Sequence, residues 1–268
     1  MVNGDGPEKP APSAEAISSF KFVQSLERGL AVIESFGHDR PRQSLSDVAR
    51  LTGLDRAAAR RFLLTLRALG YVGSDGKLFW LQPKTLDLGY RYLSSLPWWR
   101  EAQRAAEDLA MALGCPCAVA VRDRDQAVYV AYASAARFAD LARASGTRLP
   151  AYASALGRIL LAFLDEGESQ ELLARTEMVR LTHRTVTDLS RLREILAGIR
   201  QDGYALVDQE LEIGLRSLAV PIADRGGQVV AAISASPQDM RVPPDEILAT
   251  SLGALRQAAA RIAAFLPS

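Results

Sequence analysis

The chain is poor in the side chains from which enzymes most often build metal and nucleophile sites. Its 268 residues include only two histidines and two cysteines. Cys115 and Cys117 are separated by a single proline, and cysteines this close rarely form a disulfide. No second pair exists to complete a zinc site, so we expect both to be small buried hydrophobic side chains. His183 lies in an ordinary Thr-His-Arg context, and His38 lies within the amino-terminal segment discussed below.

Several sequence motifs of catalysis are also missing. There is no phosphate-cradling P-loop and no glycine-rich dinucleotide fingerprint. Residues 153–157 read Ala-Ser-Ala-Leu-Gly, which is not the Gly-x-Ser-x-Gly turn that exposes a nucleophile. The carboxylates Asp208, Glu210 and Glu212 alternate, but a structural or interfacial role suits them at least as well as acid–base chemistry. We therefore predict no catalytic residue, no metal site and no cofactor.

Long apolar runs are absent as well. No run approaches the roughly 18 residues that span a bilayer, so we expect no membrane partner. The amino-terminal residues lack the basic-then-apolar layout of a secretory signal. Residues 1–19 are instead rich in Pro, Gly, Ala, Ser and Glu, which predicts a disordered tail. Together with the scarcity of cysteine, these absences favour a cytoplasmic protein.

The overall composition of the chain is that of a globular protein, but its charged residues are unevenly distributed along the sequence. A hydrophobic content of 49% and a charged content of 24% are typical of globular proteins, and the length suits two domains. Residues 20–84 carry a net charge of +5, whereas residues 1–19 and 85–268 each carry −2. A basic amino-terminal segment suits one domain that contacts phosphates.

The segment Ser44–Tyr71 is the most informative part of the sequence. Its apolar spacing predicts two short helices separated by a Thr-Gly-Leu turn, which is the sequence form of a helix-turn-helix. Arg56, Arg60 and Arg61 lie near the start of the second helix, where base edges and phosphates are met. Such arginines can also cover a solvated face, but the turn and the position favour DNA contact. Guanidinium groups bind guanine or phosphate, and the sequence leaves both roles open for each of the three.

A hairpin is predicted directly after these helices. Two apolar segments flank Gly-Ser-Asp-Gly-Lys within residues 71–81. Helices followed by a hairpin form a winged helix, which we assign to residues 20–84. Lys77 lies on the wing, and we take Lys77 and Ser44 as further candidates for phosphate contact. Residues 85–97 are expected to form a linker helix.

The remaining residues, 98–268, predict strands in hairpin-like pairs with helices before, between and after them. This pattern is typical of an α+β domain with an antiparallel sheet flanked by helices. The expected helices of the whole chain are 25–36, 46–52 with Ser46 as N-cap, 56–69 with Asp55 as N-cap, 85–95, 98–113, 155–164, 191–201 and 243–266. The expected strands of this second part are 117–121, 127–132, 204–207, 218–222 and 229–235.

Three serines adjoin the apolar strand sequences Leu-Ala-Val-Pro-Ile and Ala-Ala-Ile-Ser-Ala. Ser234 and Ser236 alternate and so share one face of their strand, and Ser217 precedes a neighbouring strand. A hydroxyl that faces the core needs a partner, which is protein, water or ligand. For a single serine a backbone partner is the commoner case. Several serines that converge on an apolar cavity would form a small-molecule site.

With these features the chain resembles the isocitrate lyase regulator (IclR) family of bacterial transcription factors, from about Phe20 to its carboxy-terminal end. The motifs that carry the resemblance are Ser25–Ile33, the helix-turn-helix, Ala153–Leu161 and Gly214–Ile222. Within the family, the segments most similar to the β-ketoadipate-pathway subgroup are Leu96–Gln103, Gly146–Tyr152 and Asp208–Gly214. That subgroup governs the catabolism of aromatic acids.

The resemblance implies a winged helix-turn-helix, a linker helix and a GAF-like effector-binding and oligomerisation domain in residues 98–268. It implies homodimers or homotetramers on a palindromic double-stranded DNA operator, because protein symmetry is mirrored in the half-sites. It also places an effector pocket at one side of the sheet. The lining that it implies is Ala155, Leu156, Val207, Leu215, Ser217, Ser234 and Ser236.

Two departures from the family bear on the ligand. Some members have an acidic residue at Val207 and a cysteine at Ser217, and the residues present here favour a larger, partly aromatic ligand over glyoxylate. Arg148 and Tyr152 precede the pocket helix, and either could hold a carboxylate. Arg148 would do so bidentately if it points inward.

The leading hypothesis is therefore a transcriptional regulator that responds to an aromatic acid or a ring-cleavage product. A second hypothesis has the same architecture sensing another small carboxylic acid or a lactone. A third is an enzyme with an accessory DNA-binding domain, which would need a nucleophile or metal constellation that the sequence lacks. A fourth is a structural DNA-bridging protein, whose thermal stability would not respond to small ligands.

Overall fold

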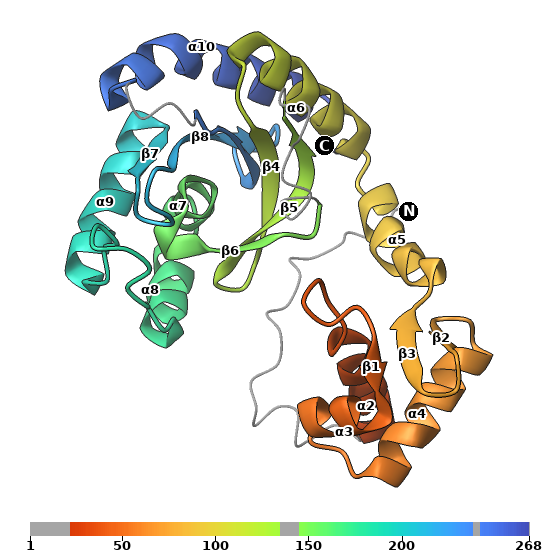
Figure 1. Ribbon diagram of the computed structural model, residues 1–268. Coiled ribbons are helices and arrows are strands. Elements are labelled where there is room, and N and C mark those ends of the chain that lie inside the picture. Colours follow the sequence, from red (N-terminus) through yellow and green to blue (C-terminus); the bar gives the residue numbers. More distant parts are fainter. Residues whose placement is uncertain (1–21, 135–144, 238–241, 268) are drawn as a thin grey trace, which may run out of the picture. The chain divides into compact units, whose positions relative to one another are not determined.

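The computed structural model describes residues 22–134, 145–237 and 242–267. The chain divides into two compact units, Met1–Tyr90 and Arg91–Ser268, which are best considered one at a time (Figure 1). The division falls within α5 (Leu86–Ser95), the helix that the sequence predicts as a linker. The predicted disordered tail, residues 1–19, lies outside the described residues.

The first unit is a small helical domain with a three-stranded sheet. Its helices are α2 (Gln24–Glu34), α3 (Leu45–Thr52) and α4 (Arg56–Ala68). The sheet has the order β1-β3-β2, from strands β1 (Gln43–Ser44), β2 (Val72–Ser74) and β3 (Leu78–Leu81). A 3-10 turn, η1 (Pro83–Thr85), leads into α5. The core side chains of this unit are Val32, Phe36, Val48, Leu63, Leu66, Val72 and Phe79.

The helix-turn-helix is closed by local signals at both sides of its turn. Gly53 ends α3 in the left-handed region at φ +67°, which glycine adopts without a steric cost. Asp55 then caps α4 by accepting a hydrogen bond from the backbone N–H of Ala58 at 2.7 Å. The predicted cap of α4 is therefore confirmed. The predicted cap of α3 is wrong, because the N-cap is Ser44 rather than Ser46.

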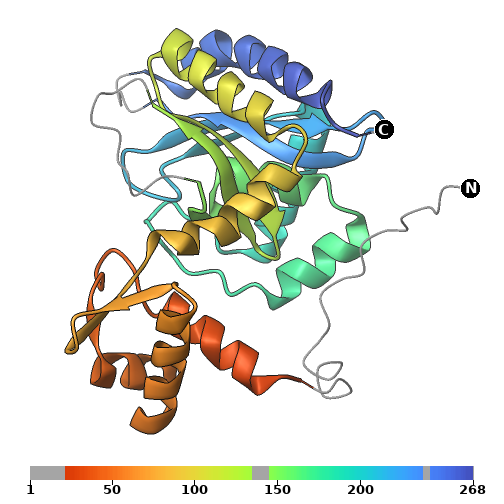
Figure 2. The ribbon, with the colours of Figure 1, turned by 90° about the vertical axis from the view of Figure 1, so that its right-hand side faces the viewer.

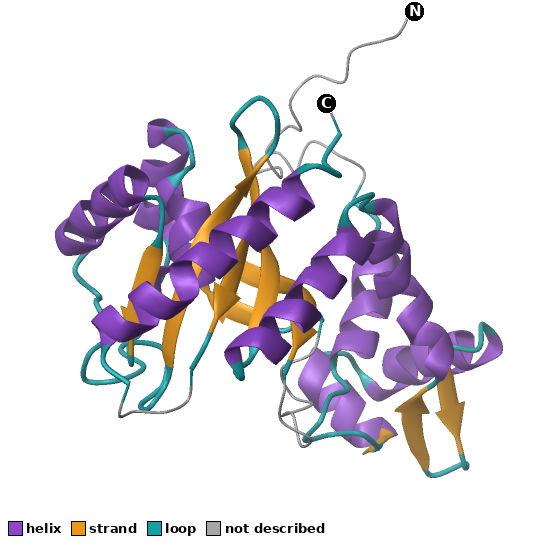
Figure 3. Cartoon of the chain, turned by 90° about the horizontal axis from the view of Figure 1, so that it is seen from above, coloured by secondary structure: helices purple, strands orange, loops and turns teal. Residues whose placement is uncertain are grey.

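The second unit is built on a six-stranded antiparallel sheet of order β6-β5-β4-β9-β8-β7 (Figure 3). The strands are β4 (Cys117–Asp123), β5 (Gln126–Ala133), β6 (Arg148–Pro150), β7 (Ala205–Asp208), β8 (Arg216–Ala223) and β9 (Val229–Ala235). β9 lies beside β4, although 105 residues that include several helices separate the end of β4 from the start of β9. Such long-range pairing joins the two halves of this unit into one sheet.

Helices cover both faces of this sheet (Figure 2). The long helices α6 (Trp99–Leu113) and α10 (Pro244–Ala263) lie on one face. The other face carries α7 (Ala155–Ala162), which follows the 3-10 turn η3 (Ala151–Ala153) and packs against α9 (Leu189–Asp202). The smaller helix α8 (Glu166–Arg175) lies beside them. The sheet is thus the middle layer of three.

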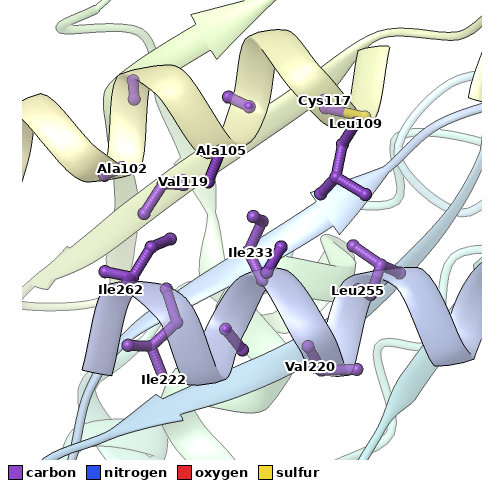
Figure 4. Close-up of a cluster of buried hydrophobic side chains, with 14 of the residues drawn as sticks. Ala102, Ala105, Leu109, Cys117, Val119, Val220, Ile222, Ile233, Leu255 and Ile262 are labelled. Atoms are coloured by element: carbon purple, nitrogen blue, oxygen red, sulfur yellow. The ribbon is translucent and has the colours of Figure 1, made fainter. Parts of the chain in front are cut away.

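Alternation along the strands creates two separate cores. Val119 and Ile233 point to the α6–α10 face, where they meet Leu109, Leu255 and Ile262 (Figure 4). Their strand neighbours Ala118 and Ala232 point to the α7 face, as the two-residue repeat of a strand requires. Burying each large aliphatic side chain contributes about 1.5–3 kcal/mol to stability. Both cysteines are free and buried in the α6–α10 core, as predicted.

The sequence-based fold, an α+β chain with an antiparallel sheet flanked by helices, is confirmed, and the predicted helices and strands lie within a few residues of their observed bounds. The sequence did not predict the strands β1 and β6, the helix α8 or the 3-10 turns η1 and η3. In the described ranges no helix has the length and apolar character needed to cross a membrane. The same ranges contain no group of three or more His, Cys, Asp or Glu side chains placed to hold a metal ion.

Candidate functional site

The outer face of α4 presents the predicted arginines to solvent. Helical periodicity turns Ala59 and Leu63 into the core of the first unit, and Arg56, Arg60 and Arg61 lie on the exposed side. Within the described ranges these three guanidinium groups form no ion pair. Their charge is therefore available to an external anion.

The wing is a tight turn with a cation beside it. Asp75 accepts hydrogen bonds from the backbone N–H groups of Leu78 at 2.8 Å and Lys77 at 3.0 Å, and these bonds hold the pKa of Asp75 below its usual value of 3.8. The Lys77 side chain is exposed, as predicted for a wing residue. Arg42 lies 4.4 Å from the centre of the Trp80 ring and 3.8 Å from Asp75. Sequence reasoning did not single out Arg42, because its partner Trp80 is 38 residues away.

Ser44 has a structural task at the start of α3. Its Oγ accepts a hydrogen bond from the backbone N–H of Asp47 at 3.3 Å and donates one to Asp47 Oδ2 at 2.7 Å. The backbone N–H of Ser44 donates to the same carboxylate, which completes a capping box. Hydrogen bonds from the Ser44 side chain and backbone hold the pKa of Asp47 below 3.8. The Ser44 hydroxyl proton is thus engaged within α3.

A pocket opens on the α7 face of the six-stranded sheet. Ala155 and Leu156, the first two residues of α7, form one wall, and Ser217, Ser234 and Ser236 form part of the opposite one. The complete lining is Tyr129, Leu149, Ala153, Ser154, Ala155, Leu156, Val207, Leu211, Leu215, Ser217, Ser234 and Ser236. The side chains lie close together, and the cavity leaves about 20 Å³ for the centre of a water molecule, room for about one water.

The polar groups of the pocket come from two sources. The register of β8 and β9 pairs Leu218 with Ala235, so Ser217 and Ser236 form the next cross-strand pair, and their Oγ atoms are hydrogen-bonded at 2.8 Å. At the other wall, Ser154 caps α7 by accepting a hydrogen bond from the backbone N–H of Gly157 at 3.2 Å. The first-turn N–H groups of α7 have no carbonyl partner within the helix and carry partial positive charge.

The structure brings together seven of the nine residues expected in the pocket, and Arg148 and Tyr152 are not among them. Leu149 faces the pocket, so Arg148 faces the other way in the same short strand, where its guanidinium lies 2.5 Å from Asp123 Oδ2. Tyr152 is buried, and its hydroxyl donates to the carbonyl of Val179 at 2.8 Å and accepts from its N–H at 3.0 Å. Neither side chain lines the pocket, since Arg148 forms an exposed ion pair and the Tyr152 hydroxyl is hydrogen-bonded to Val179. That either residue holds a carboxylate stays a prediction.

Sequence reasoning missed five lining residues. These are Tyr129, Leu149, Ala153, Ser154 and Leu211. Ser154 carried a usable signal, since a serine directly before an apolar helix is a typical N-cap. Leu149 could have been found by noticing that alternate residues of a strand face alternate sides. Leu211 lies in a loop, where no helix or strand period predicts the direction of a side chain.

A winged helix with free arginines and a second unit with a semi-polar pocket are the parts of a ligand-responsive DNA-binding regulator. The family model described as the IclR helix-turn-helix domain matches residues 25–76, and the one described as the bacterial transcriptional regulator IclR C-terminal domain matches residues 90–264. The chain belongs to the IclR family of bacterial transcriptional regulators, which are not enzymes.

Relatives and solved structures agree with that family. The chain is 40% identical to the Pca regulon regulatory protein of Pseudomonas putida over 88% of this chain and 83% of that protein. It is 34% identical to the p-hydroxybenzoate hydroxylase transcriptional activator of Acinetobacter baylyi, over 92% and 93% of the two chains. It is also similar to the crystal structure of an IclR homologue from Microbacterium hydrocarbonoxydans complexed with 4-hydroxybenzoate. That likeness has a TM-score of 0.77 and 28% identity over 90% of this chain and 98% of the other.

Proposed function

We propose that this regulator binds a small aromatic acid, such as 4-hydroxybenzoate or protocatechuate, or a ring-cleavage product of one, and thereby controls genes for aromatic-acid catabolism. The observation that carries the proposal is the pocket, which combines apolar and aromatic walls with a helix N-terminus and four serines. Small-molecule sites have this composition, with mostly apolar walls and a few placed polar groups. The names of the relatives, one bound to 4-hydroxybenzoate and one governing p-hydroxybenzoate hydroxylase, support the choice of ligand class.

Each end of such an acid has matching groups in the pocket. We place the carboxylate at the first turn of α7, where the N–H groups of Ala155 and Leu156 and the positive end of the helix dipole favour an anion. The paired hydroxyls of Ser217 and Ser236 then offer hydrogen bonds to the carboxylate or to a ring hydroxyl. The ring lies between Tyr129 and the leucines of the lining.

The DNA side of the proposal rests on α4 and the wing. Arg56, Arg60 and Arg61 would enter the major groove or hold its flanking phosphates, with Lys77 on a phosphate beyond them. Ser44 would contribute to DNA binding indirectly, by capping and so fixing the first turn of α3. The regulator would bind this DNA in the bacterial cytoplasm. A symmetric homo-oligomer would bind a palindromic operator.

A homodimer, or a tetramer made of two, is supported by apolar surface that the described part of each unit leaves uncovered. Leu26 and Leu30 share one side of α2, with 63% and 46% of their surface exposed. Leu86 and Leu88 of α5 are exposed to 76% and 45%. The two leucines of α2, one helical turn apart, mark an interaction surface, and a second copy of the chain supplies the same groups. Leu26→Glu with Leu30→Glu should shift the sedimentation coefficient to that of a monomer.

The test of the sensing proposal is the thermal stability of the full chain against a panel of acids. Protocatechuate, 4-hydroxybenzoate, catechol, cis,cis-muconate and β-ketoadipate form the panel, with glyoxylate and pyruvate as outgroups. A ligand at 100 times its Kd that binds only the folded state adds about 2.7 kcal/mol. A saturable shift with one aromatic-pathway compound supports the proposal. A shift with the outgroup acids alone, or with none of the compounds, contradicts it.

A further inference from the structure

The wall of the pocket opposite the sheet is made by two segments that are far apart in the sequence. One is the start of α7, with Ala155 and Leu156. The other is the loop of residues 209–215, which we call the pocket loop and which contributes Leu211 and Leu215. Any change in how α7 and the pocket loop lie against each other changes the shape of the cavity.

A buried ion pair joins these two segments. Arg158, one helical turn after the pocket residues of α7, donates from Nη1 to Glu210 Oε1 at 2.6 Å and from Nη2 to Glu210 Oε2 at 2.7 Å. The two side chains are only 2% and 11% exposed. Arg158 also donates from Nε to the carbonyl of Tyr152 at 2.8 Å. A bidentate pair of this kind fixes both distance and orientation, because the planar guanidinium and carboxylate must lie edge to edge.

The same carboxylate and its neighbours hold a third segment. Glu210 Oε2 accepts a hydrogen bond from the N–H of Val186 at 2.8 Å. The hydroxyls of Thr185 and Thr182 donate to the carbonyls of Glu210 and Gln209, each at 2.7 Å. Both threonines are buried. The segment 182–186, the pocket loop and α7 are therefore connected through one guanidinium and one carboxylate.

The pocket loop is also held in an unusual backbone conformation. Gln209 has φ +60°, in the left-handed region that non-glycine residues rarely adopt. Its N–H donates to the carbonyl of Leu215 at 2.8 Å, and its side-chain Oε1 accepts from the N–H of Gly214 at 3.2 Å. Such a conformation persists where surrounding contacts determine it. The next residue, Glu210, is fixed in turn by its ion pair with Arg158.

The size of the cavity sets a condition on ligand entry. It has room for about one water, so an aromatic acid enters only if its walls separate. On one side the walls are β8 and β9, whose backbones are hydrogen-bonded into the middle of a six-stranded sheet. On the other side α7 and the pocket loop form no part of that sheet. The second wall is the one that can move without breaking a strand ladder.

We propose that Arg158 and Glu210 are positioning residues of the effector pocket, because their ion pair joins α7 and the pocket loop into one wall that moves as a unit when an aromatic acid binds. The inference rests on the proposed function for the identity of the ligand. Neither side chain lines the pocket. They act by holding Leu211 and Leu215 in register with Ala155 and Leu156, so that the wall keeps its own shape while it moves.

The test uses Glu210→Gln in the full chain, with a matched control on the opposite face of the sheet. Glu101 of α6 accepts from Nη2 of Arg261 of α10 at 2.6 Å, and its side chain is 12% exposed, nearly the same as that of Glu210. Glu101→Gln therefore removes the same charge, from a carboxylate of similar exposure, in an ion pair that does not touch the pocket; its partner Arg261 is 45% exposed and bonds only Oε1 of Glu101. Arg158→Lys, which keeps the charge but loses the bidentate geometry, is the milder variant if Glu210→Gln does not fold.

The first measurement is the Kd for 4-hydroxybenzoate by titration calorimetry, at a temperature well below every melting temperature. We expect both glutamine variants to melt earlier than the wild type. We expect Glu210→Gln to bind at least tenfold more weakly, Arg158→Lys to be intermediate, and Glu101→Gln to stay within twofold. An unchanged Kd in Glu210→Gln, or equal losses in Glu210→Gln and Glu101→Gln, would overturn the positioning role.

A second measurement needs no ligand, and so separates this proposal from the proposed function. Hydrogen–deuterium exchange of Glu210→Gln should rise together in α7, the pocket loop and residues 182–186, and not in β8 or β9. In Glu101→Gln it should rise in α6 and α10 only. Exchange that rises in the pocket loop alone would show that the segments are not joined, whatever the wild type binds.

Discussion

The two units prepare their binding surfaces in opposite ways. The arginine face of α4 is open to solvent, and its guanidinium groups make no ion pair within the described residues, so DNA would meet it without any prior rearrangement. The pocket of the second unit is nearly closed, and the hydroxyls of Ser217 and Ser236 are already paired with each other. Affinity for DNA should therefore depend on charge and salt, whereas affinity for an effector should depend on packing and on the energy of opening a wall.

The largest expected effect is on DNA binding. Arg60→Ala with Arg61→Ala should weaken binding to a duplex about 100-fold, since each arginine contact contributes about 1–3 kcal/mol. If both arginines contact phosphates, the slope of log K against log salt should fall by about two units. Fluorescence anisotropy across a salt series measures both quantities. Arg193→Ala removes one charge from the exposed surface of α9 and serves as the control. A double variant that binds DNA like the wild type would contradict the view that the charge of the α4 arginines determines DNA affinity.

The next effect concerns the packing of the pocket wall. A Cβ on Gly157 would lie 2.2 Å from the Cα of Ala151, so Gly157→Ala must push α7 away from η3. We expect a loss of about 1–3 kcal/mol in unfolding free energy, with weaker effector binding. Gly198→Ala is the matched control within α9, where nothing lies within 4 Å of the added methyl. It should stabilise the chain by about 0.4–1 kcal/mol. Urea denaturation distinguishes the two, and equal outcomes would contradict the close contact.

The hydroxyl pair of the pocket should have a smaller effect. Ser217→Ala or Ser236→Ala removes one hydrogen bond to the effector and should weaken binding about tenfold, in line with about 1 ± 0.5 kcal/mol per bond. Because the two hydroxyls are bonded to each other, the double variant should lose less than the sum of the single variants. Calorimetric titration with 4-hydroxybenzoate measures the coupling energy between the two serines. Strictly additive losses would show that the two hydroxyls bind the effector independently.

The smallest effect tests whether Ser44 acts as a cap or as a phosphate contact. Ser44→Ala should lower the unfolding free energy by about 1 kcal/mol, whereas Ser44→Asn should restore most of it, because asparagine is a good N-cap. The pKa of Asp47 is lowered in the folded state, so its part in the capping box is present above pH 4 and is lost as the pH falls through the folded pKa. Thermal melts from pH 7 to pH 3 follow that loss. Unequal DNA affinities of Ser44→Asn and the wild type would favour the phosphate role.

The same contrast explains what could be read from the sequence. The arginine face lies on one continuous helix, so a 3.6-residue period was enough to predict that Arg56, Arg60 and Arg61 face outward. Ser44 and Ser46 are both plausible caps, and only the acidic residue three positions after Ser44 distinguishes them. β1 has two residues and β6 three, too few to show a strand period.

The pocket draws on seven separated segments, and no local pattern brings these together. The three serines were found from their own strands, and Ala155, Leu156, Val207 and Leu215 only through the family resemblance. The direction in which Arg148 faces could not be predicted, because β6 has three residues and shows no strand period. Arg158 and Glu210 were overlooked as a pair, since 52 residues separate them in the sequence.

The burial of both cysteines has a practical consequence for spectroscopy. Cys115 and Cys117 are at most 5% exposed, and this burial shields both thiols although their mutual hydrogen bond raises the pKa of Cys117 and lowers that of Cys115. A maleimide dye should therefore react with an introduced surface cysteine far faster than with the native ones. Ile213→Cys, at a pocket-loop position that is 55% exposed, would carry such a dye. Its emission would report the motion of that wall in real time, without removing any natural residue of the core.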